Sequence, residues 1–341
     1  MTQKAADSAH LGLGTRWSTA RKLAGYGAAS TMSLYLVVKV IWVLSALLSN
    51  GPKDPGTSTA DWVTLNMVTV GMSAIGVALG LALAQQWGRR IPAQPLIFLA
   101  WTGAGFLIPM VPYMVVSAVL SAAGISAGGE DGGTSGGGQV MPAWEMVFIS
   151  VGFAGMAVGL AIALPIYMRE RWPDAFVGRL GNDLITVAPA RSPRDLCMVR
   201  AVLAVSSALG LLWLYWAIGG TLGLDLAHRE MDLNERLLSG NSGIWAFIGA
   251  WSIWVVTTRQ HAARLPLWVP MSLAFAASGS LFAWSGWKLS MAVLRPGGYM
   301  PPEHPVVTLV QHAFAIGAGI AILAGLVQTY RDRAANRSTQ V

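Results

Sequence analysis

Apolar residues run along this chain in eight long segments, and shorter stretches between them carry most of the charged residues. A hydrocarbon core about 30 Å thick requires about 20 predominantly apolar residues per helix, and these segments supply that length repeatedly. The pattern predicts an all-α integral membrane protein with eight membrane helices, at Tyr26–Ser49, Trp62–Gln86, Pro95–Ala122, Ala143–Met168, Met198–Leu222, Gly243–Thr258, Leu267–Trp287 and Val306–Tyr330.

The basic residues fall mostly on one set of alternate loops. Of the 23 Lys and Arg residues, 17 lie on the side of the two termini, five lie on the opposite side, and Lys39 lies inside a predicted helix. By the positive-inside rule, both termini are expected on the cytoplasmic side of the cell membrane. The net charge of +7 therefore requires no nucleic-acid partner, and the basic ends are expected to face the lipid bilayer.

Composition and motifs exclude several classes of protein. The chain is 54% hydrophobic and 11% charged, whereas a soluble domain carries about 25% charged residues. The single cysteine, Cys197, excludes an intramolecular disulfide and a thiolate metal cluster. Glycine-rich nucleotide-binding, HExxH and GxSxG patterns are absent. The sequence thus predicts no metal and no cofactor, and it favours a protein that is not an enzyme.

The second part of the chain repeats the first. A shift of 174 positions aligns Trp42 with Trp216 and Gly105 with Gly279, and a shift of 162 aligns Arg169-Glu170-Arg171 with Arg331-Asp332-Arg333. We therefore predict two four-helix repeats with the same polarity, related by an axis along the membrane normal. The predicted units are a tail at 1–25, a first repeat at 26–168, a cytoplasmic linker at 169–197, a second repeat at 198–330 and a tail at 331–341.

One stretch carries a resemblance to a known group of proteins. The residues from Tyr215 to Asp225, Tyr-Trp-Ala-Ile-Gly-Gly-Thr-Leu-Gly-Leu-Asp, resemble a Tyr-Trp-Ala-x-Gly-Gly-x-x-Gly signature in small four-helix bacterial membrane proteins of uncharacterised function. The chain as a whole, rich in Ala, Gly, Trp and Arg, is similar to multi-pass proteins of actinobacteria. The resemblance implies a tandem duplication of a four-helix unit and implies no activity.

Lys39 is the most unusual residue of the predicted helices, because it lies near the middle of an apolar segment. A Lys at the centre of a membrane helix costs about 2.5–3.5 kcal/mol on insertion scales, and such residues face the bundle interior and find partners. We expect Lys39 to face inward. It either contacts a substrate or ion or takes part in proton coupling, or it is a packing residue that bonds to carbonyl groups or reaches a wet crevice on the outer side.

Other polar groups lie at depths compatible with a shared pocket. Gln311 and His312 are about two turns into the last helix, and Glu145 is just inside the fourth, where it could neutralise Lys39. Trp216 lies deep enough to form a pocket wall. We take Lys39, His312, Gln311, Glu145 and Trp216 as candidate binding residues, although a lone intramembrane His is more often a packing residue.

Two proline residues interrupt the third predicted helix. Pro109 and Pro112 are expected to kink or break it, and the freed backbone groups must be satisfied inside the bundle. A kink beside a buried Lys suits a binding site.

Two functions remain open from the sequence. The first is a permease-like protein that handles a small molecule or ion in a central cavity between the repeats. The second is a non-catalytic membrane partner or regulatory subunit, recognised by another protein through the loop at 169–197. A membrane enzyme has less support, because no paired carboxylates or His cluster are present.

Overall fold

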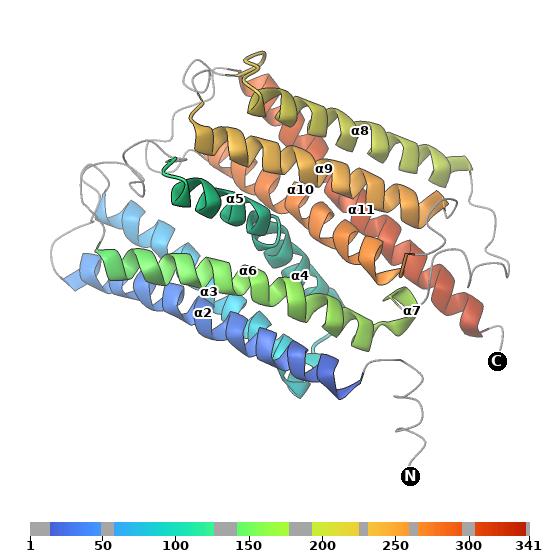
Figure 1. Cartoon of the computed structure of the whole chain (residues 1–341), viewed down its shortest axis with the longest axis horizontal. Helices are drawn as coiled ribbons and strands as arrows, with labels where there is room; N and C mark the ends of the chain where they lie inside the picture. Colours follow the sequence, from blue (N-terminus) through green and yellow to red (C-terminus); the bar gives the residue numbers. More distant parts are fainter. Residues whose placement is uncertain are drawn as a thin grey trace, which may run out of the picture.

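The computed structural model describes residues 14–48, 58–125, 142–176, 193–224, 231–258, 265–294 and 304–338. Regular structure in these ranges is helical (Figure 1). Its elements are α2 (Thr15–Leu48), α3 (Thr59–Ala84), the 3-10 turn η1 (Gln86–Arg90), α4 (Ala93–Leu107), α5 (Met110–Ala122), α6 (Ala143–Arg171), α7 (Pro173–Phe176), α8 (Pro193–Ala217), α9 (Leu233–Thr258), α10 (Trp268–Leu294) and α11 (Pro305–Ser338).

Each of the eight apolar segments predicted from the sequence is helical, but several boundaries differ. The sixth segment was expected to begin at Gly243, and α9 begins instead at Leu233. The side chain of Asp232 accepts a hydrogen bond from the backbone of Glu235 at 2.7 Å. This N-cap starts the helix before its apolar run begins.

The third segment ends at Ala122 as expected, whereas the fifth ends earlier than expected. The third is broken into α4 and α5 at Pro109, as the two prolines predict, since proline removes a backbone donor. The fifth ends at Ala217 and not at Leu222, because Gly219 turns the chain with φ of 99°.

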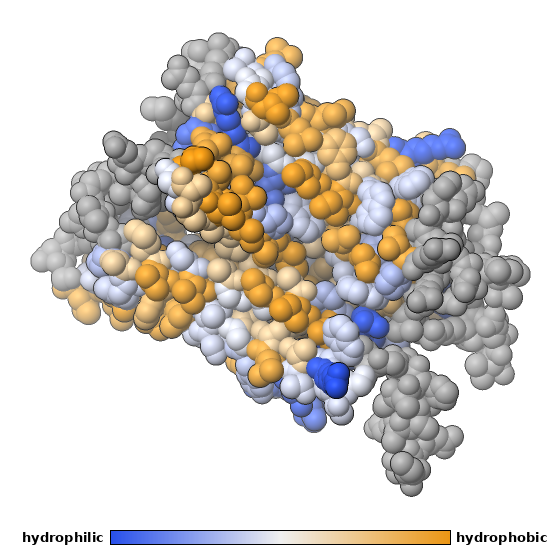
Figure 2. Space-filling model, in the orientation of Figure 1, coloured by the Kyte–Doolittle hydropathy of each residue, from blue (hydrophilic) through white to orange (hydrophobic). Residues whose placement is uncertain are grey.

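The surface and the helix lengths are those of a helical membrane protein. Six segments are long and apolar enough to cross a bilayer: α2, α3, α4 with α5, α6, α8 and α11. Large apolar side chains such as Leu44, Leu47, Val119 and Phe314 are exposed on their outer faces, and apolar groups cover much of the face shown in Figure 2. Lipid tails are the environment that such a surface fits.

The first half of the bundle is held by close contacts of α2 with α3 and α6. Small residues on α6 let α2 approach, since a Cβ added at Gly159 would lie 2.6 Å from the Cβ of Ala28. A Cβ added at Gly25 of α2 would lie 2.9 Å from the carbonyl oxygen of Gly80 on α3. Small residues at such crossings are the usual basis of helix packing in membranes.

The second half, α8 to α11, is arranged around α10. This helix packs against α9 and α11 within its own half and against α4 of the first half. Figure 1 shows α4 and α5 lying between the two groups of helices. Most of the middle of α10 is buried, including Ala274, Ser278 and Leu281.

The halves meet where α4 crosses α10. Gly105 and Gly279 face each other so closely that a Cβ on either would overlap the opposite backbone. The indole of Trp101 donates to the hydroxyl of Ser278 at 2.9 Å, and the indole of Trp284 donates to the carbonyl of Phe106 at 3.2 Å. The second bond reaches a carbonyl beside the proline break, so the break is stabilised by the other half.

The predicted linker is helical where the structure describes it. The α6 helix extends past the expected end at Met168 to Arg171, and α7 follows at once and packs against α10 and α11. Phe176 is buried there. Residues 177–192 of the predicted linker lie outside the described residues. Residues 193–197 form the start of α8.

Candidate functional site

Lys39 lies among aromatic and polar side chains of the first half. Its Nζ donates to Oδ1 of Asn66 on α3 at 3.1 Å. The same nitrogen lies 4.0 Å from the ring centroid of Trp42 and 5.6 Å from that of Tyr35. Tyr35, Lys39 and Trp42 share one face of α2, because residues three and four apart lie on the same side of a helix.

Glu145 closes this cluster from α6. The indole Nε1 of Trp42 donates to Oε2 of Glu145 at 2.8 Å, and Glu145 is 3% exposed. Trp42 thus bonds to the carboxylate of Glu145 through its N–H and presents its ring to the Lys39 ammonium. Glu145 lies in the first turn of α6, where the helix dipole stabilises a carboxylate. We call Tyr35, Lys39, Trp42, Asn66 and Glu145 the Lys39 box.

The box is built on a buried amide that sequence reasoning missed. Asn66 is 3% exposed, and its Nδ2 donates to the carbonyl of Trp62 at 2.9 Å. The Trp62 ring stacks on Trp42 with centroids 5.7 Å apart. A single polar residue within an apolar span was the available signal, since buried amides in membrane helices normally have partners.

His312 and Gln311 belong to a different cluster, in the second half. The indole of Trp213 on α8 donates to Oε1 of Gln311 at 3.0 Å. His312 is 5% exposed, and its Nδ1 is buried without a hydrogen-bond partner. None of the contacts found in the described residues joins either residue to Lys39. The expected contact of Lys39 with His312 and Gln311 is therefore replaced by the contact with Asn66.

Trp216 stabilises a turn and does not face the Lys39 box. Its indole donates to the carbonyl of Leu222 at 3.0 Å. This bond closes the turn formed by the Tyr-Trp-Ala signature, in which Gly219 and Gly223 have φ of 99° and 81°. A Cβ on Gly220 would overlap the ring of Tyr215. The spacing of the signature is thus explained by a helix-ending turn.

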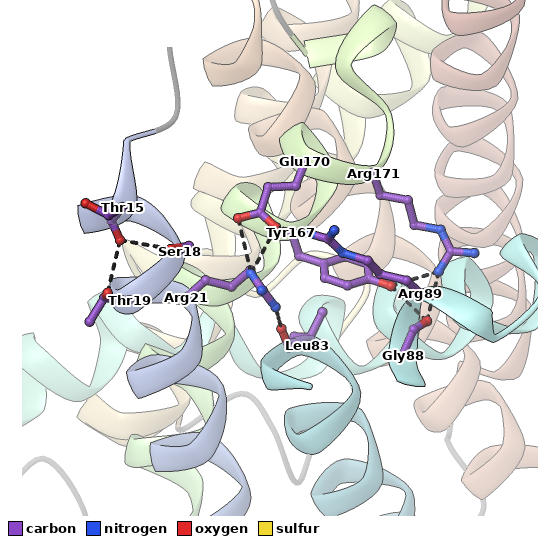
Figure 3. Close-up of polar contacts among 10 residues, drawn as sticks. All are labelled: Thr15, Ser18, Thr19, Arg21, Leu83, Gly88, Arg89, Tyr167, Glu170 and Arg171. Atoms are coloured by element: carbon purple, nitrogen blue, oxygen red, sulfur yellow. Dashed lines mark hydrogen bonds and ion pairs between the residues drawn. The ribbon is translucent and has the colours of Figure 1, made fainter. Parts of the chain in front are cut away.

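A second charged cluster, which the sequence did not single out, lies where α2 begins (Figure 3). Arg21 is 5% exposed, and its Nε lies 3.2 Å from the carboxylate of Glu170 on α6. Its NH1 donates to the carbonyl of Leu83 at the end of α3. Arg89 of η1 forms an ion pair with the same carboxylate.

Arg171 extends this cluster to the turn between α3 and α4. Its NH1 donates to the carbonyl of Gly88 at 3.0 Å, and its NH2 donates to the carbonyl of Ile91 at 2.6 Å. The hydroxyl of Tyr167 also donates to Gly88, at 2.9 Å. We call Arg21, Arg89, Tyr167, Glu170 and Arg171 the Arg21 clamp. It holds the ends of α2, α3 and α6 and the turn between α3 and α4 together.

Groups of three or more His, Cys, Asp or Glu that could hold a metal are not found among the described residues. Comparison with known proteins finds no matching family, no similar curated protein and no similar solved structure.

Proposed function

We propose that the chain is a tandem duplication of a four-helix unit. The helix bounds support this: α3 and α9 both begin and end 174 residues apart, at Thr59–Ala84 and Leu233–Thr258. The α6 and α11 helices begin 162 residues apart, at Ala143 and Pro305. Residues that align in the two halves, Gly105 and Gly279, contact each other. A residue that touches its own counterpart is typical of a twofold axis.

The same proposal gives the chain eight membrane spans. The α9 and α10 helices contain 26 and 27 residues, so at 1.5 Å per residue each is longer than the hydrocarbon core of about 30 Å. Neither contains a stretch as apolar as those of the other six. Because α10 packs against α4, α9 and α11, its Ser278, Ser280 and Ser285 are buried in protein.

Both termini are proposed to lie on the cytoplasmic side of the cell membrane. The start of α2 and the end of α11 lie at one end of the bundle (Figure 1). The Arg21 clamp lies at that end, and the sequence places most of its Lys and Arg there.

We propose further that the protein handles a small solute or ion at the Lys39 box. The observation that supports this is an ammonium and a carboxylate held within apolar spans, since such groups are costly and mark solute pathways. The alternative is a packing role, but the Arg21 clamp already ties α2, α3 and α6 together at their other ends.

Currents from reconstituted protein on a solid-supported membrane test this proposal. Concentration jumps would be applied with inorganic cations, organic ammonium ions, amino acids, organic anions and neutral sugars. We expect one class to give a signal that Lys39→Met abolishes and that Lys22→Met, an exposed lysine on the same helix, retains. A signal that survives Lys39→Met would contradict the site.

The absence of any signal above that of protein-free liposomes would favour the other function. In that case the chain acts as a non-catalytic partner or regulatory subunit. Its recognition through the loop at 169–197 would then be tested by deleting residues 177–192 and measuring the loss of the co-purifying protein.

A further inference from the structure

Every group that faces the Lys39 ammonium is one that attracts a cation. Asn66 presents its carbonyl oxygen at 3.1 Å. Trp42 presents its ring face at 4.0 Å, and Tyr35 presents its own at 5.6 Å. The carboxylate of Glu145 accepts a hydrogen bond from the same Trp42 at 2.8 Å. An aromatic face combined with a nearby carboxylate is the arrangement that recognises ammonium groups.

Two N–H donors of the box, on Trp42 and Asn66, are already in use. The indole N–H of Trp42 is bonded to Glu145, and the amide N–H of Asn66 is bonded to the carbonyl of Trp62. An anion in the box would be repelled by the carboxylate of Glu145. The box is consequently suited to a cation and unsuited to an anion.

The nature of the partners also separates organic from inorganic cations. Calcium takes six to eight oxygen ligands, and magnesium requires an octahedron of oxygens. The box offers one amide oxygen, one carboxylate and two ring faces. Ring faces contribute most to a cation that is large and weakly hydrated.

We infer that the Lys39 box is a site for a small organic ammonium ion, and that the Lys39 side chain is its built-in occupant, which an ammonium solute displaces. The inference rests on the proposed solute-handling function for its physiological role. The flexible four-carbon stem of Lys39 lets the ammonium leave the box without movement of the α2 backbone. The exchange replaces one cation by another, so the charge in the box is preserved.

The first test removes the Lys39 ammonium from the box by substitution. Purified Lys39→Met would be titrated with methylammonium chloride and tetramethylammonium chloride, with sodium chloride at equal ionic strength as the reference. We expect the midpoint of thermal unfolding to rise by a few degrees and to saturate, because a ligand that binds only the folded state stabilises it. Wild type should show a smaller rise at each concentration, since Lys39 competes.

The matched variant is Lys39→Met combined with Glu145→Gln, which removes the negative charge and keeps the shape of the side chain. It should show no ammonium-specific rise. An equal rise in this double variant, or an equal effect of sodium chloride on Lys39→Met, would overturn the inference.

A second measurement uses the unaltered protein, so it does not depend on the folding of any variant. Wild type would be acetylated briefly with an amine-reactive ester, with and without tetramethylammonium, which has no reactive N–H. We expect acetylation of Lys39, measured by peptide mass spectrometry, to increase several-fold, while acetylation of the exposed Lys22 stays constant. Unchanged labelling of Lys39 would show that the ion does not displace it.

The outcomes separate this inference from the proposed function. Ammonium binding to Lys39→Met without any solute-dependent current would support the site and reject solute handling. A Lys39-dependent current carried by an anion, with no ammonium binding to Lys39→Met, would support solute handling and reject the cation site.

Discussion

The Arg21 clamp and the Lys39 box both place charged groups between α2, α3 and α6, but they hold these groups differently. In the clamp, three arginines bond to backbone carbonyls or to the carboxylate of Glu170. In the box, one ammonium faces two aromatic rings and a single amide oxygen. Directional bonds to the backbone lock a side chain, whereas ring faces hold a cation that can exchange. Under the proposed function, charged groups would fix the helices at one end of the bundle and bind a solute at the other.

The largest expected effect comes from breaking the clamp. Arg21→Ala leaves the carbonyl of Leu83 without its donor and Glu170 with one cation fewer, so we expect a loss of about 3–5 kcal/mol in the free energy of unfolding. Arg16→Ala, an exposed arginine on the same helix, should change it by less than about 0.5 kcal/mol. Unfolding by SDS in mixed micelles measures both. Equal losses would mean that the clamp does not fix the helix ends.

Within the box, the bond between Trp42 and Glu145 should be the strongest. Trp42→Phe leaves a buried carboxylate short of a donor, and we expect a loss of about 1.5–3 kcal/mol. Trp62→Phe is the control, because the indole N–H of Trp62 is buried and has no partner. Should Trp62→Phe cost as much as Trp42→Phe in the same unfolding assay, ring area and not the hydrogen bond would hold Glu145.

The crossing of the two halves tests how much close helix packing contributes to stability, independently of charge. Gly279→Ala places a methyl group against the carbonyl of Trp101, so we expect a loss of about 1–3 kcal/mol from overpacking. Gly286→Ala on the same helix meets nothing within 4 Å and should add about 0.5–1 kcal/mol through helix propensity. Thermal unfolding of the two variants compares them. A stabilising Gly279→Ala would refute the close approach of α4 and α10.

The smallest effect on stability should come from Lys39 itself. Lys39→Met removes the cost of burying an ammonium but leaves Oδ1 of Asn66 without a donor, so the two changes should offset to within about 1 kcal/mol. Adding Asn66→Leu should then raise the free energy of unfolding above that of Lys39→Met. If Lys39→Met unfolds as readily as Arg21→Ala, the box, like the clamp, serves to fix the helices.

Sequence reasoning identified only some of the residues of the candidate site. It singled out Lys39 and Glu145, because a charge inside an apolar run is visible without any structure. It did not find Asn66, and it grouped Gln311 and His312 with Lys39 on depth alone. The depth of a residue in the membrane follows from its position along a helix. Its partner depends also on how each helix is rotated about its axis, and the separation of 27 positions between Lys39 and Asn66 does not reveal that rotation.

Arg21 and Arg89 illustrate the same difficulty at the other end of the bundle. Their positions in the sequence predict that both residues determine topology and face anionic lipid. In the structure, Arg21 is buried against Glu170, 149 residues away, and Arg89 shares that carboxylate. Charge identity predicted the end of the bundle on which these residues lie, and packing decided whether they meet lipid or protein.

The sequence by itself determined the helical class, the position of each helix and the proline break, because apolar length and backbone chemistry are local properties. Only the tertiary structure decided which face of each helix turns inward. A membrane helix is apolar all round, so its sequence lacks the amphipathic stripe that marks the buried face of a soluble helix. In the first half, the crossings of Gly25 with Gly80 and of Gly159 with Ala28 set those faces, and they thereby brought Lys39, Asn66 and Glu145 of α2, α3 and α6 into one cluster.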